Sequence, residues 1–449
     1  MKDGIGVLIL CGLLVGCTNE STLPGERIDI DIPLKNSIGV VSDLEGNTVG
    51  NYENTLNISR NVPINIPIPR TQGNWLHVTG NRQHNPGNLR LQTNLQLLWQ
   101  ASIGTGNSAT ARISTEPISA GGRIFTMDAA HLVRAFSLSG SFLWERNLTY
   151  PGNDPNEVSG GGLAFGEGLL IASTSFGELY AIDPSTGRDI WVQEFSAPAT
   201  SAPTIANGRV YLVTKDNKSW AVNIETGKLD WSVLSIEGLA TVSGNGGPAI
   251  TSDSVILGYP SGEIISAELN TGTVIWRDFV GGSRGRGPIS VLTGITASPV
   301  VVDNRVYISN QSGSTVAFDL ATGSKIWSVP EGSFGSVLKI DNSVFLISDT
   351  SELIRIDADS GNQIWSVGLP NYKDDRPRRR KAVYSNFGPL MANGQIIVAS
   401  GDGLIRFFDP VTAELVKRIP IPNGAATPPI IVNNVLYIIS TDGTLFAFG

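Results

Sequence analysis

Chemically reactive side chains are scarce in this sequence. It contains two cysteines, Cys11 and Cys17, and three histidines, His77, His84 and His131. No HxH or HExxH spacing occurs, and no glycine-rich stretch is followed by the Lys-Ser/Thr of a phosphate loop. The sequence therefore predicts no catalytic residues, no metal site and no cofactor.

Charged side chains are also few. They make up 16% of the chain, against roughly 25% in an average soluble domain. In contrast, 51 glycines and 25 prolines provide an excess of turn-forming residues. Long charged helices and coiled coils are excluded, and a turn-rich, all-β protein is favoured. The net charge of −8 argues against nucleic acid as a partner.

Long apolar runs are missing apart from one at the N-terminus. Residues 4–16 read GIGVLILCGLLVG, which is too short to span a bilayer and matches the core of a signal peptide. The run ends in Leu14-Val15-Gly16-Cys17, which resembles the lipobox of bacterial lipoproteins. That resemblance implies cleavage of residues 1–16 and lipidation of Cys17. The alternative is an ordinary secretory signal followed by a chance cysteine.

Residues 17–73 lack a sustained hydrophobic period and contain repeated prolines, as in NVPINIPIPR. We interpret them as an extended tether between the membrane lipid and the folded part. The alternating segment RIDIDIP at 27–33 could add a strand to a sheet edge, but a linker is favoured.

An internal repeat fills residues 74–449. Tryptophans recur at intervals of 38 to 51 residues, and most close a common pattern, as in AIDPSTGRDIW, AVNIETGKLDW and AFDLATGSKIW. The positions are Trp99, Trp144, Trp191, Trp231, Trp276, Trp327 and Trp365, and Lys417 occupies the eighth. Short apolar strands and tight turns precede each copy of the pattern. Each repeat unit is therefore expected to form a four-stranded antiparallel propeller blade.

Eight such modules begin near residues 115, 161, 201, 246, 297, 335, 386 and 426. The last module ends at Gly449 without a fourth strand, whereas an unassigned strand surrounds Trp99. We therefore expect one eight-bladed β-propeller, closed when the N-terminal strand completes the last blade and removes the open edge. The tryptophans are expected to wedge between blades with their indole N–H groups bonded to backbone.

The A-x-D-x-x-T-G-x-x-x-W unit resembles the repeat of quinoprotein-like eight-bladed propellers. The lipobox, LPGERI at Leu23–Ile28 and WLHVTGNRQHNPGNL at Trp75–Leu89 further resemble the alphaproteobacterial form of the BamB family. These are lipoprotein subunits of the BAM machine that assembles β-barrels in the outer membrane. The resemblance implies a non-catalytic, periplasm-facing scaffold that binds the periplasmic domains of BamA and other BAM subunits. It also implies that the scaffold aids the insertion of unfolded barrel precursors into the membrane.

The longest intervals between tryptophans mark insertions, which on propellers commonly carry partner contacts. Two insertions, residues 231–247 and 278–295, are the candidate partner-binding loops. Their candidate contact residues are Ile236, Leu239, Val242, Arg284, Arg286, Leu292 and Ile295. Ordinary solvated loops are the alternative.

A third insertion, DDRPRRRKAVY at 374–384, is the strongest charge feature of the chain. Its basic residues are Arg376, Arg378, Arg379, Arg380 and Lys381. Such a cluster suits an anionic lipid or an acidic partner, while a solvated loop flanked by two aspartates is the simpler interpretation.

Two other functions stay open at this point. Quinone-dependent dehydrogenases share the propeller repeat, but they commonly carry adjacent cysteines, which the mature chain would lack. A periplasmic propeller that binds cell-wall carbohydrate is the second alternative, because a shallow binding face leaves little sequence motif.

Overall fold

The computed structural model describes residues 61–149, 160–237, 246–282, 294–374, 376 and 382–449. The compact unit to which they belong runs from Ile58 to Gly449 and so includes the end of the predicted tether. Within the described residues there are strands and turns and no helix. Accordingly, no helix among them has the length and hydrophobicity to cross a membrane.

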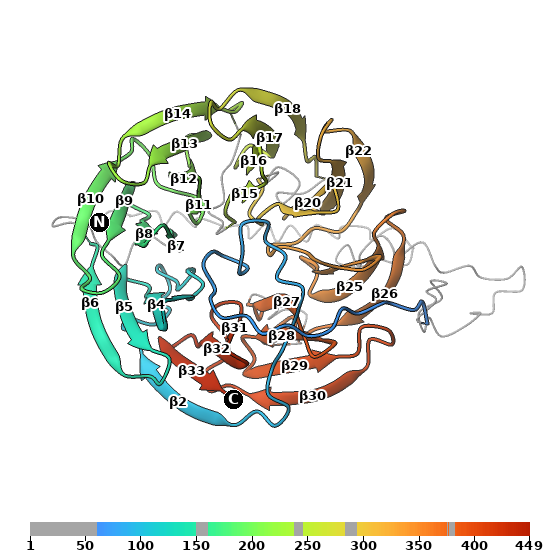
Figure 1. Cartoon of the computed structure of the whole chain (residues 1–449). Coiled ribbons are helices and arrows are strands. Elements are labelled where there is room, and N and C mark those ends of the chain that lie inside the picture. The colour runs from blue at the N-terminus through green and yellow to red at the C-terminus, as the bar shows by residue number, and fades with distance from the viewer. Residues whose placement is uncertain (1–60, 150–159, 238–245, 283–293, 375, 377–381) are drawn as a thin grey trace, which may run out of the picture. The chain divides into compact units, whose positions relative to one another are not determined.

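The strands form an eight-bladed propeller, which Figure 1 shows along its axis. Blade 1 consists of β3 (Ile118–Ala120), β4 (Arg123–Met127), β5 (Leu132–Ser137) and β6 (Phe142–Asn147), and blade 2 of β7 (Gly162–Gly166), β8 (Leu169–Ser173), β9 (Glu178–Ile182) and β10 (Asp189–Glu194). Blade 3 consists of β11 (Thr204–Ala206), β12 (Arg209–Thr214), β13 (Lys218–Asn223) and β14 (Leu229–Leu234), and blade 4 of β15 (Ala249–Ile250), β16 (Ser254–Gly258), β17 (Glu263–Glu268) and β18 (Val274–Phe279). Blade 5 consists of β19 (Val300–Val302), β20 (Arg305–Asn310), β21 (Ser314–Asp319) and β22 (Lys325–Val329), and blade 6 of β23 (Leu338–Ile340), β24 (Ser343–Ile347), β25 (Glu352–Asp357) and β26 (Gln363–Gly368). Blade 7 consists of β27 (Asn386–Ala392), β28 (Gln395–Ser400), β29 (Leu404–Phe408) and β30 (Leu415–Pro420).

The eighth blade closes the ring with strands from both ends of the chain. Its order is β31 (Ile430–Val432), β32 (Val435–Ile439), β33 (Thr444–Phe448) and β2 (Leu97–Ser102). Trp99 of β2 lies opposite Ala447, and Gln96 and Gly449 exchange backbone hydrogen bonds. The prediction of eight blades closed by the strand around Trp99 is confirmed, and each predicted module starts within four residues of its innermost strand.

The hydrophobic core lies between neighbouring blades rather than at one centre. For example, Tyr211 and Val213 of blade 3 pack with Leu257 and Ile265 of blade 4 in one buried cluster. The two-residue side-chain alternation of a strand turns apolar residues to both faces of each blade, so both faces are covered by the neighbours. This arrangement accounts for the low charge content of the sequence.

Candidate functional site

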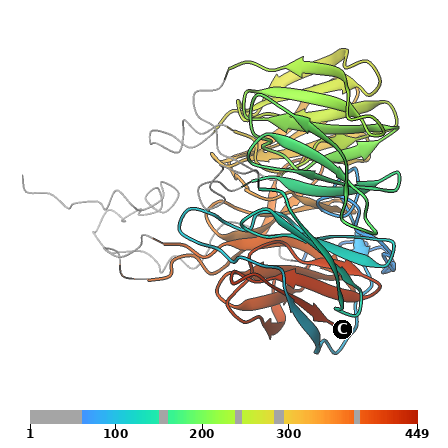
Figure 2. The ribbon, with the colours of Figure 1, turned by 90° about the vertical axis from the view of Figure 1, so that its left-hand side faces the viewer.

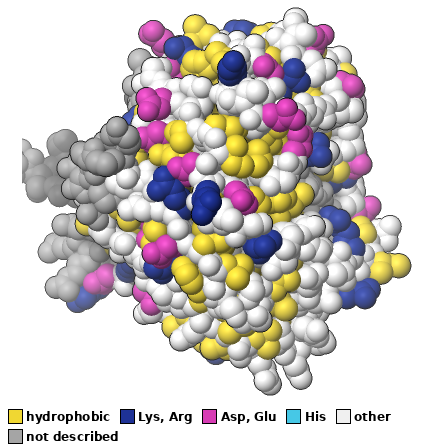
Figure 3. Space-filling model, turned by 60° about the vertical axis from the view of Figure 1, so that its left-hand side comes forward, with side chains coloured by type: hydrophobic (Ala, Val, Ile, Leu, Met, Phe, Trp, Pro, Cys, Tyr) yellow, Lys and Arg dark blue, Asp and Glu magenta, His cyan; other side chains and the backbone are white. Residues whose placement is uncertain are grey.

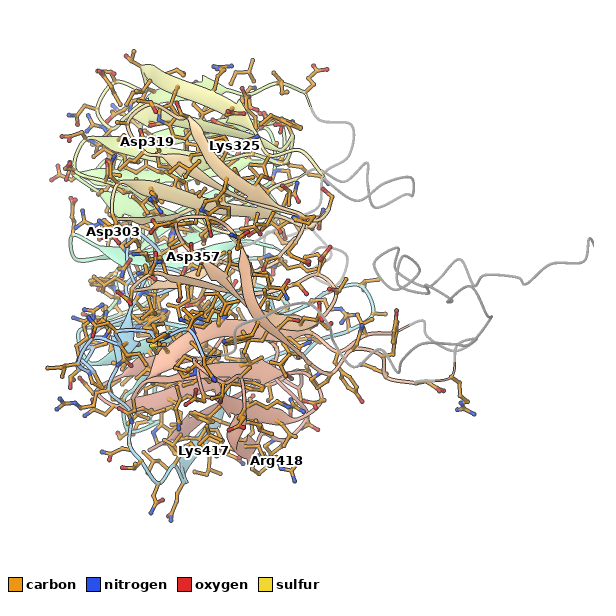
Figure 4. The ribbon with its side chains drawn as sticks, turned by 90° about the vertical axis from the view of Figure 1, so that its right-hand side faces the viewer. Asp303, Asp319, Lys325, Asp357, Lys417 and Arg418 are labelled. Atoms are coloured by element: carbon orange, nitrogen blue, oxygen red, sulfur yellow. The ribbon has the colours of Figure 1, made fainter. Side chains whose placement is uncertain are left out.

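The antiparallel blades give the ring two chemically different faces. Turns between the first and second strands and between the third and fourth strands form one face, here called the turn face. Turns between the second and third strands, together with the connections from one blade to the next, form the opposite connection face (Figure 2). Asp303, Asp319 and Asp357 belong to the turn face and lie on the same side of the ring in Figure 4.

The predicted partner-binding loops are connections between blades and therefore belong to the connection face. Five of their candidate contacts, Leu239, Val242, Arg284, Arg286 and Leu292, lie outside the described residues. Ile236 lies two residues after the end of β14, and its side chain is 51% exposed. Ile295 is only 8% exposed and packs with Ile256 and Val306 in the core between blades 4 and 5. Its side chain therefore supports the base of the loop and is not presented to a partner.

A buried carboxylate, Glu263, holds the start of the loop between blades 3 and 4. Its Oε2 accepts hydrogen bonds from the Ser235 hydroxyl at 2.6 Å and from the Ile236 amide at 3.1 Å. Its Oε1 pairs with the half-exposed guanidinium of Arg277 at 3.3 Å. Because these bonds fix the backbone at Ile236, the exposed side chain is presented from a rigid base.

The connection between blades 6 and 7 forms a short two-stranded stem that the sequence did not predict. Tyr372 and Val383 form an isolated antiparallel bridge, and the Lys373 ammonium lies 5.6 Å from the centroid of the Tyr384 ring. Arg376, from the predicted basic cluster, is exposed and ion-paired with Asp374 at 2.7 Å. The remaining cluster residues, Arg378, Arg379, Arg380 and Lys381, lie outside the described residues.

Phe334 is a second feature of this face that sequence reasoning missed. It is 61% exposed in the connection between blades 5 and 6. The available signal was an isolated aromatic residue between Gly332 and Gly335, in a segment without strand periodicity.

The turn face carries a different structure, a segment of residues 70–92 that we call the plug. It crosses the centre of the ring in Figure 1 and bonds to all eight blades. Trp75 pairs with Ser119 of blade 1, and β1 (Asn88–Leu89) adds a parallel strand to β27 of blade 7. The other blades are contacted through Phe165, Ile205, Ile250, Val301, Lys339 and Asn433. The plug thus ties the inner strands of the ring together.

Buried titratable groups gather in the plug and directly against it. The carboxyl of Glu116 accepts hydrogen bonds from the Trp75 indole at 2.6 Å and the Thr79 amide at 3.0 Å, and burial raises its pKa to about 8. Burial lowers the pKa of His77 to about 3 and that of His84 to about 4. These histidines are therefore neutral at neutral pH. Among the described residues, no three His, Cys, Asp or Glu side chains stand together in a group that could hold a metal ion.

The repeated tryptophans lie at the seams between blades. Each indole N–H donates to a backbone carbonyl of the next blade, over 2.8 to 3.3 Å. The acceptors are the carbonyls of Leu138, Pro184, Ile224, Leu269, Leu320, Ala358 and Pro410. These side chains stabilise the ring and leave both faces free for other roles.

Comparison with known sequences identifies relatives of this architecture. Residues 129–367 match the family described as "Outer membrane protein assembly factor BamB". A curated relative of that name from Moranella endobia (strain PCIT) is 29% identical over 246 residues, or 53% of this chain and 63% of that protein. The matched part therefore spans slightly less than two thirds of this relative's length.

Two solved structures illustrate the likeness in fold. The crystal structure of BamB from Moraxella catarrhalis has a TM-score of 0.66 at 20% identity, covering 79% of this chain and 99% of that one. A europium-containing methanol dehydrogenase has a TM-score of 0.64 at 13% identity, covering 84% and 98%. At these identities the fold is shared with both a BamB protein and an enzyme, so the family match has to distinguish between them.

Proposed function

Because the chain belongs to the family of outer membrane protein assembly factor BamB, we propose that it is a non-catalytic scaffold of the BAM complex. It holds the periplasmic domains of BamA and aids the insertion of barrel proteins into the outer membrane. The rigid, closed ring supports this role, since a scaffold has to present its contact residues without reorganising. Lipid attached to Cys17 anchors the chain to the outer membrane, and the propeller faces the periplasm.

The observation that carries the proposal is the fixed presentation of Ile236 on the connection face. Its amide is bonded to buried Glu263 while its side chain is 51% exposed. An apolar side chain on a rigid base, beside the Arg277 guanidinium, is suited to a protein interface with an apolar centre and a charged rim. The candidate contacts Leu239, Val242, Arg284, Arg286 and Leu292 belong, by sequence, to the connections that follow β14 and β18, and they lie outside the described residues.

Affinity purification from detergent-solubilised membranes tests the proposal. The tagged wild-type chain is expected to recover BamA, identified by mass spectrometry. Recovery of unrelated cell-wall proteins without BamA would contradict the scaffold role. The double variant Leu239→Asp and Leu292→Asp is expected to weaken recovery while the propeller stays folded.

Ile236→Asp is expected to lower BamA recovery at least tenfold, because it places a charge in an apolar contact. The matched control is Ile190→Asp, since Ile190 on β10 is also 51% exposed but lies on the outer wall. Apolar side chains on the wall seen in Figure 3 are spread among charged ones. Equal losses in both variants would show that general surface hydrophobicity, and not this loop, governs binding.

A quinone-dependent dehydrogenase is the second candidate, favoured by the fold shared with methanol dehydrogenase. The described residues contain no group of three His, Cys, Asp or Glu side chains that would hold the metal ion of such an enzyme. Addition of pyrroloquinoline quinone and Ca²⁺ is expected to produce no alcohol- or sugar-dependent dye reduction. Saturable dye reduction would favour the enzyme.

A further inference from the structure

The plug forms an open cavity on the turn face, opposite the face proposed for partner binding. Its volume is about 330 Å³, at the lower end of the range of small-molecule sites. The lining residues come only from the plug and are Gln72, Gly73, Asn74, Leu76, His77, Gly80, Asn81, Arg82 and Gln83. The cavity therefore suits a ligand of the size of one sugar acid or a dipeptide.

The lining is rich in hydrogen-bond donors and positive in charge. It contains four carboxamide side chains and the guanidinium of Arg82, and no acidic residue. The carboxamides of Gln72 and Asn81 already donate to the carbonyls of Asn74 and Asn85, whereas those of Asn74 and Gln83 remain available to a ligand. Arg82 and Gln83 are exposed side chains. Because Arg82 has no carboxylate partner within the cavity, its planar donor pair remains available there for an anionic group.

His77 is a buried residue of the lining, and the position of its ring proton follows from its bonding. Its Nε2 accepts a hydrogen bond from the Ile205 amide at 3.1 Å, so the ring proton resides on Nδ1. Nδ1 has no hydrogen-bond partner, although the side chain is only 3% exposed. Burial, with smaller effects of His84 and Arg82, lowers the pKa of His77 to about 3 and keeps the ring neutral. A protonated Nδ1 cannot coordinate a metal ion, and because it is buried it does not reach a ligand in the cavity.

The cavity wall is fixed before any ligand arrives. The Asn81 Oδ1 accepts hydrogen bonds from the amides of Gln83 and Asn85, and the Arg82 carbonyl accepts from the Ile250 amide at 2.8 Å. Gly80 has a φ of +91°, and a Cβ there would approach the Trp75 ring to 3.2 Å. Such preorganisation reduces the entropy cost of binding a small ligand.

From the cationic, carboxamide-rich lining and the fixed backbone, we infer that the plug cavity binds a small carboxylate whose neighbouring atoms are hydroxyl or amide groups. The Arg82 guanidinium binds the carboxylate, and the carboxamides of Asn74 and Gln83 bond to the neutral polar groups of the ligand. This site is independent of the scaffold role proposed above.

Isothermal titration calorimetry of the full chain in detergent tests the inference with two matched pairs of probes. One pair is glucuronate and glucose, and the other is acetyl-Ala-Ala with a free or an amidated carboxyl group. At least one carboxylate is expected to bind saturably, at least tenfold more tightly than its neutral partner. Binding of glucuronate identifies a sugar acid, and binding of the free peptide identifies a chain terminus.

Arg82→Gln is expected to weaken the binding of that carboxylate at least tenfold, without a change in thermal unfolding. The matched control is Arg90→Gln, because Arg90 is an exposed arginine of the same plug outside the cavity lining. Asn74→Ala provides a second variant in which the guanidinium is retained, and it is expected to weaken binding by a smaller factor. The inference is overturned by absence of saturable binding up to millimolar probe, by equal binding of inorganic phosphate, or by equal losses in Arg82→Gln and Arg90→Gln.

Discussion

At the scale of single residues, Glu116 shows how burial couples the plug to pH. Its Oε1 accepts both the Trp75 indole N–H and the Thr79 amide N–H, so this one oxygen fixes the first turn of the plug on blade 1. Burial raises its pKa from 4.5 to about 8, which means that the folded state binds this proton more tightly than the unfolded chain. The contribution of Glu116 to the free energy of unfolding is therefore complete below pH 4.5 and is lost as the pH rises towards 8.

Glu116→Gln is expected to remove this pH dependence. The Gln Oε1 accepts the same two hydrogen bonds but carries no charge at any pH. The free energy of unfolding of the variant, relative to wild type, should therefore rise by about 1.4 kcal/mol per pH unit between pH 5 and 8. Urea denaturation of both proteins at each pH measures this difference.

The comparison is internally controlled, because His77, His84 and His131 titrate equally in both proteins and cancel. Their lowered pKa values act in the opposite direction, since that stabilisation is present above pH 6.5 and is lost as pH falls. Parallel pH profiles of the two proteins would mean that Glu116 is already ionised in the folded state at pH 5.

At the scale of elements, the repeating contact is a tryptophan of one blade against the glycine of the next blade's outer turn. Gly272, for example, has a φ of +72°, and a Cβ there would lie 2.7 Å from the Trp231 ring. At Gly272 the ring occupies the space that a Cβ would need. The glycine is therefore required both by its backbone conformation and by this close approach.

Lys417 replaces the tryptophan at the one blade whose neighbour lacks this turn. In blade 8 the outer turn is replaced by two segments that are not joined to each other, where Gln96 before β2 bonds to Gly449 after β33. With no turn to cover, the Lys417 ammonium donates to the Thr93 carbonyl at 3.1 Å and lies 4.4 Å from the centroid of the Phe407 ring. Figure 4 shows Lys417 beside Arg418 on the outermost strand of blade 7.

Gly272→Ala is expected to lower the free energy of unfolding by about 2–4 kcal/mol, from left-handed backbone strain and overpacking against Trp231. The control is the reverse change at the corresponding position of blade 7, where Ala413 already adopts a φ of 62°. Ala413→Gly should change stability by less than about 1 kcal/mol, because strain relief and the entropy of glycine oppose each other. A change of less than about 1 kcal/mol in Gly272→Ala as well would show that the close approach to Trp231 carries no strain.

These elements explain what the sequence could and could not predict. The blades were predictable because the same strands, turns and tryptophan recur, so each copy supports the assignment of the others. The plug occurs once, and its contacts, such as Gln72 with Asn433, join segments that are far apart in the chain. Ile295 was expected on the surface because apolar loop residues have no periodicity from which burial can be inferred.

At the scale of the whole molecule, the ring is closed by non-covalent pairing of β2 with β33. In every other blade the four antiparallel strands follow one another in the chain. Blade 8 is therefore the one blade in which an outer strand, β2, can separate from the other three without a connecting turn to hold it. A covalent link across the seam should restrict the unfolded chain over nearly the whole propeller. Ser102 and Thr444 are directly opposed Cα partners in this pair and suit a disulfide.

Ser102→Cys with Thr444→Cys, in a chain whose two native cysteines are replaced by alanine, is expected to form this disulfide under oxidising conditions. The matched control is Lys218→Cys with Leu234→Cys, since these opposed residues of β13 and β14 enclose only a short segment of blade 3. Because loop-closure entropy grows with the logarithm of loop length, the seam disulfide should stabilise the protein by about 2–3 kcal/mol more than the control. Oxidised and reduced forms of both proteins, compared by chemical denaturation, give this difference. If the seam cysteines stay reduced while the control pair oxidises, β2 does not complete blade 8, and the closed ring is wrong.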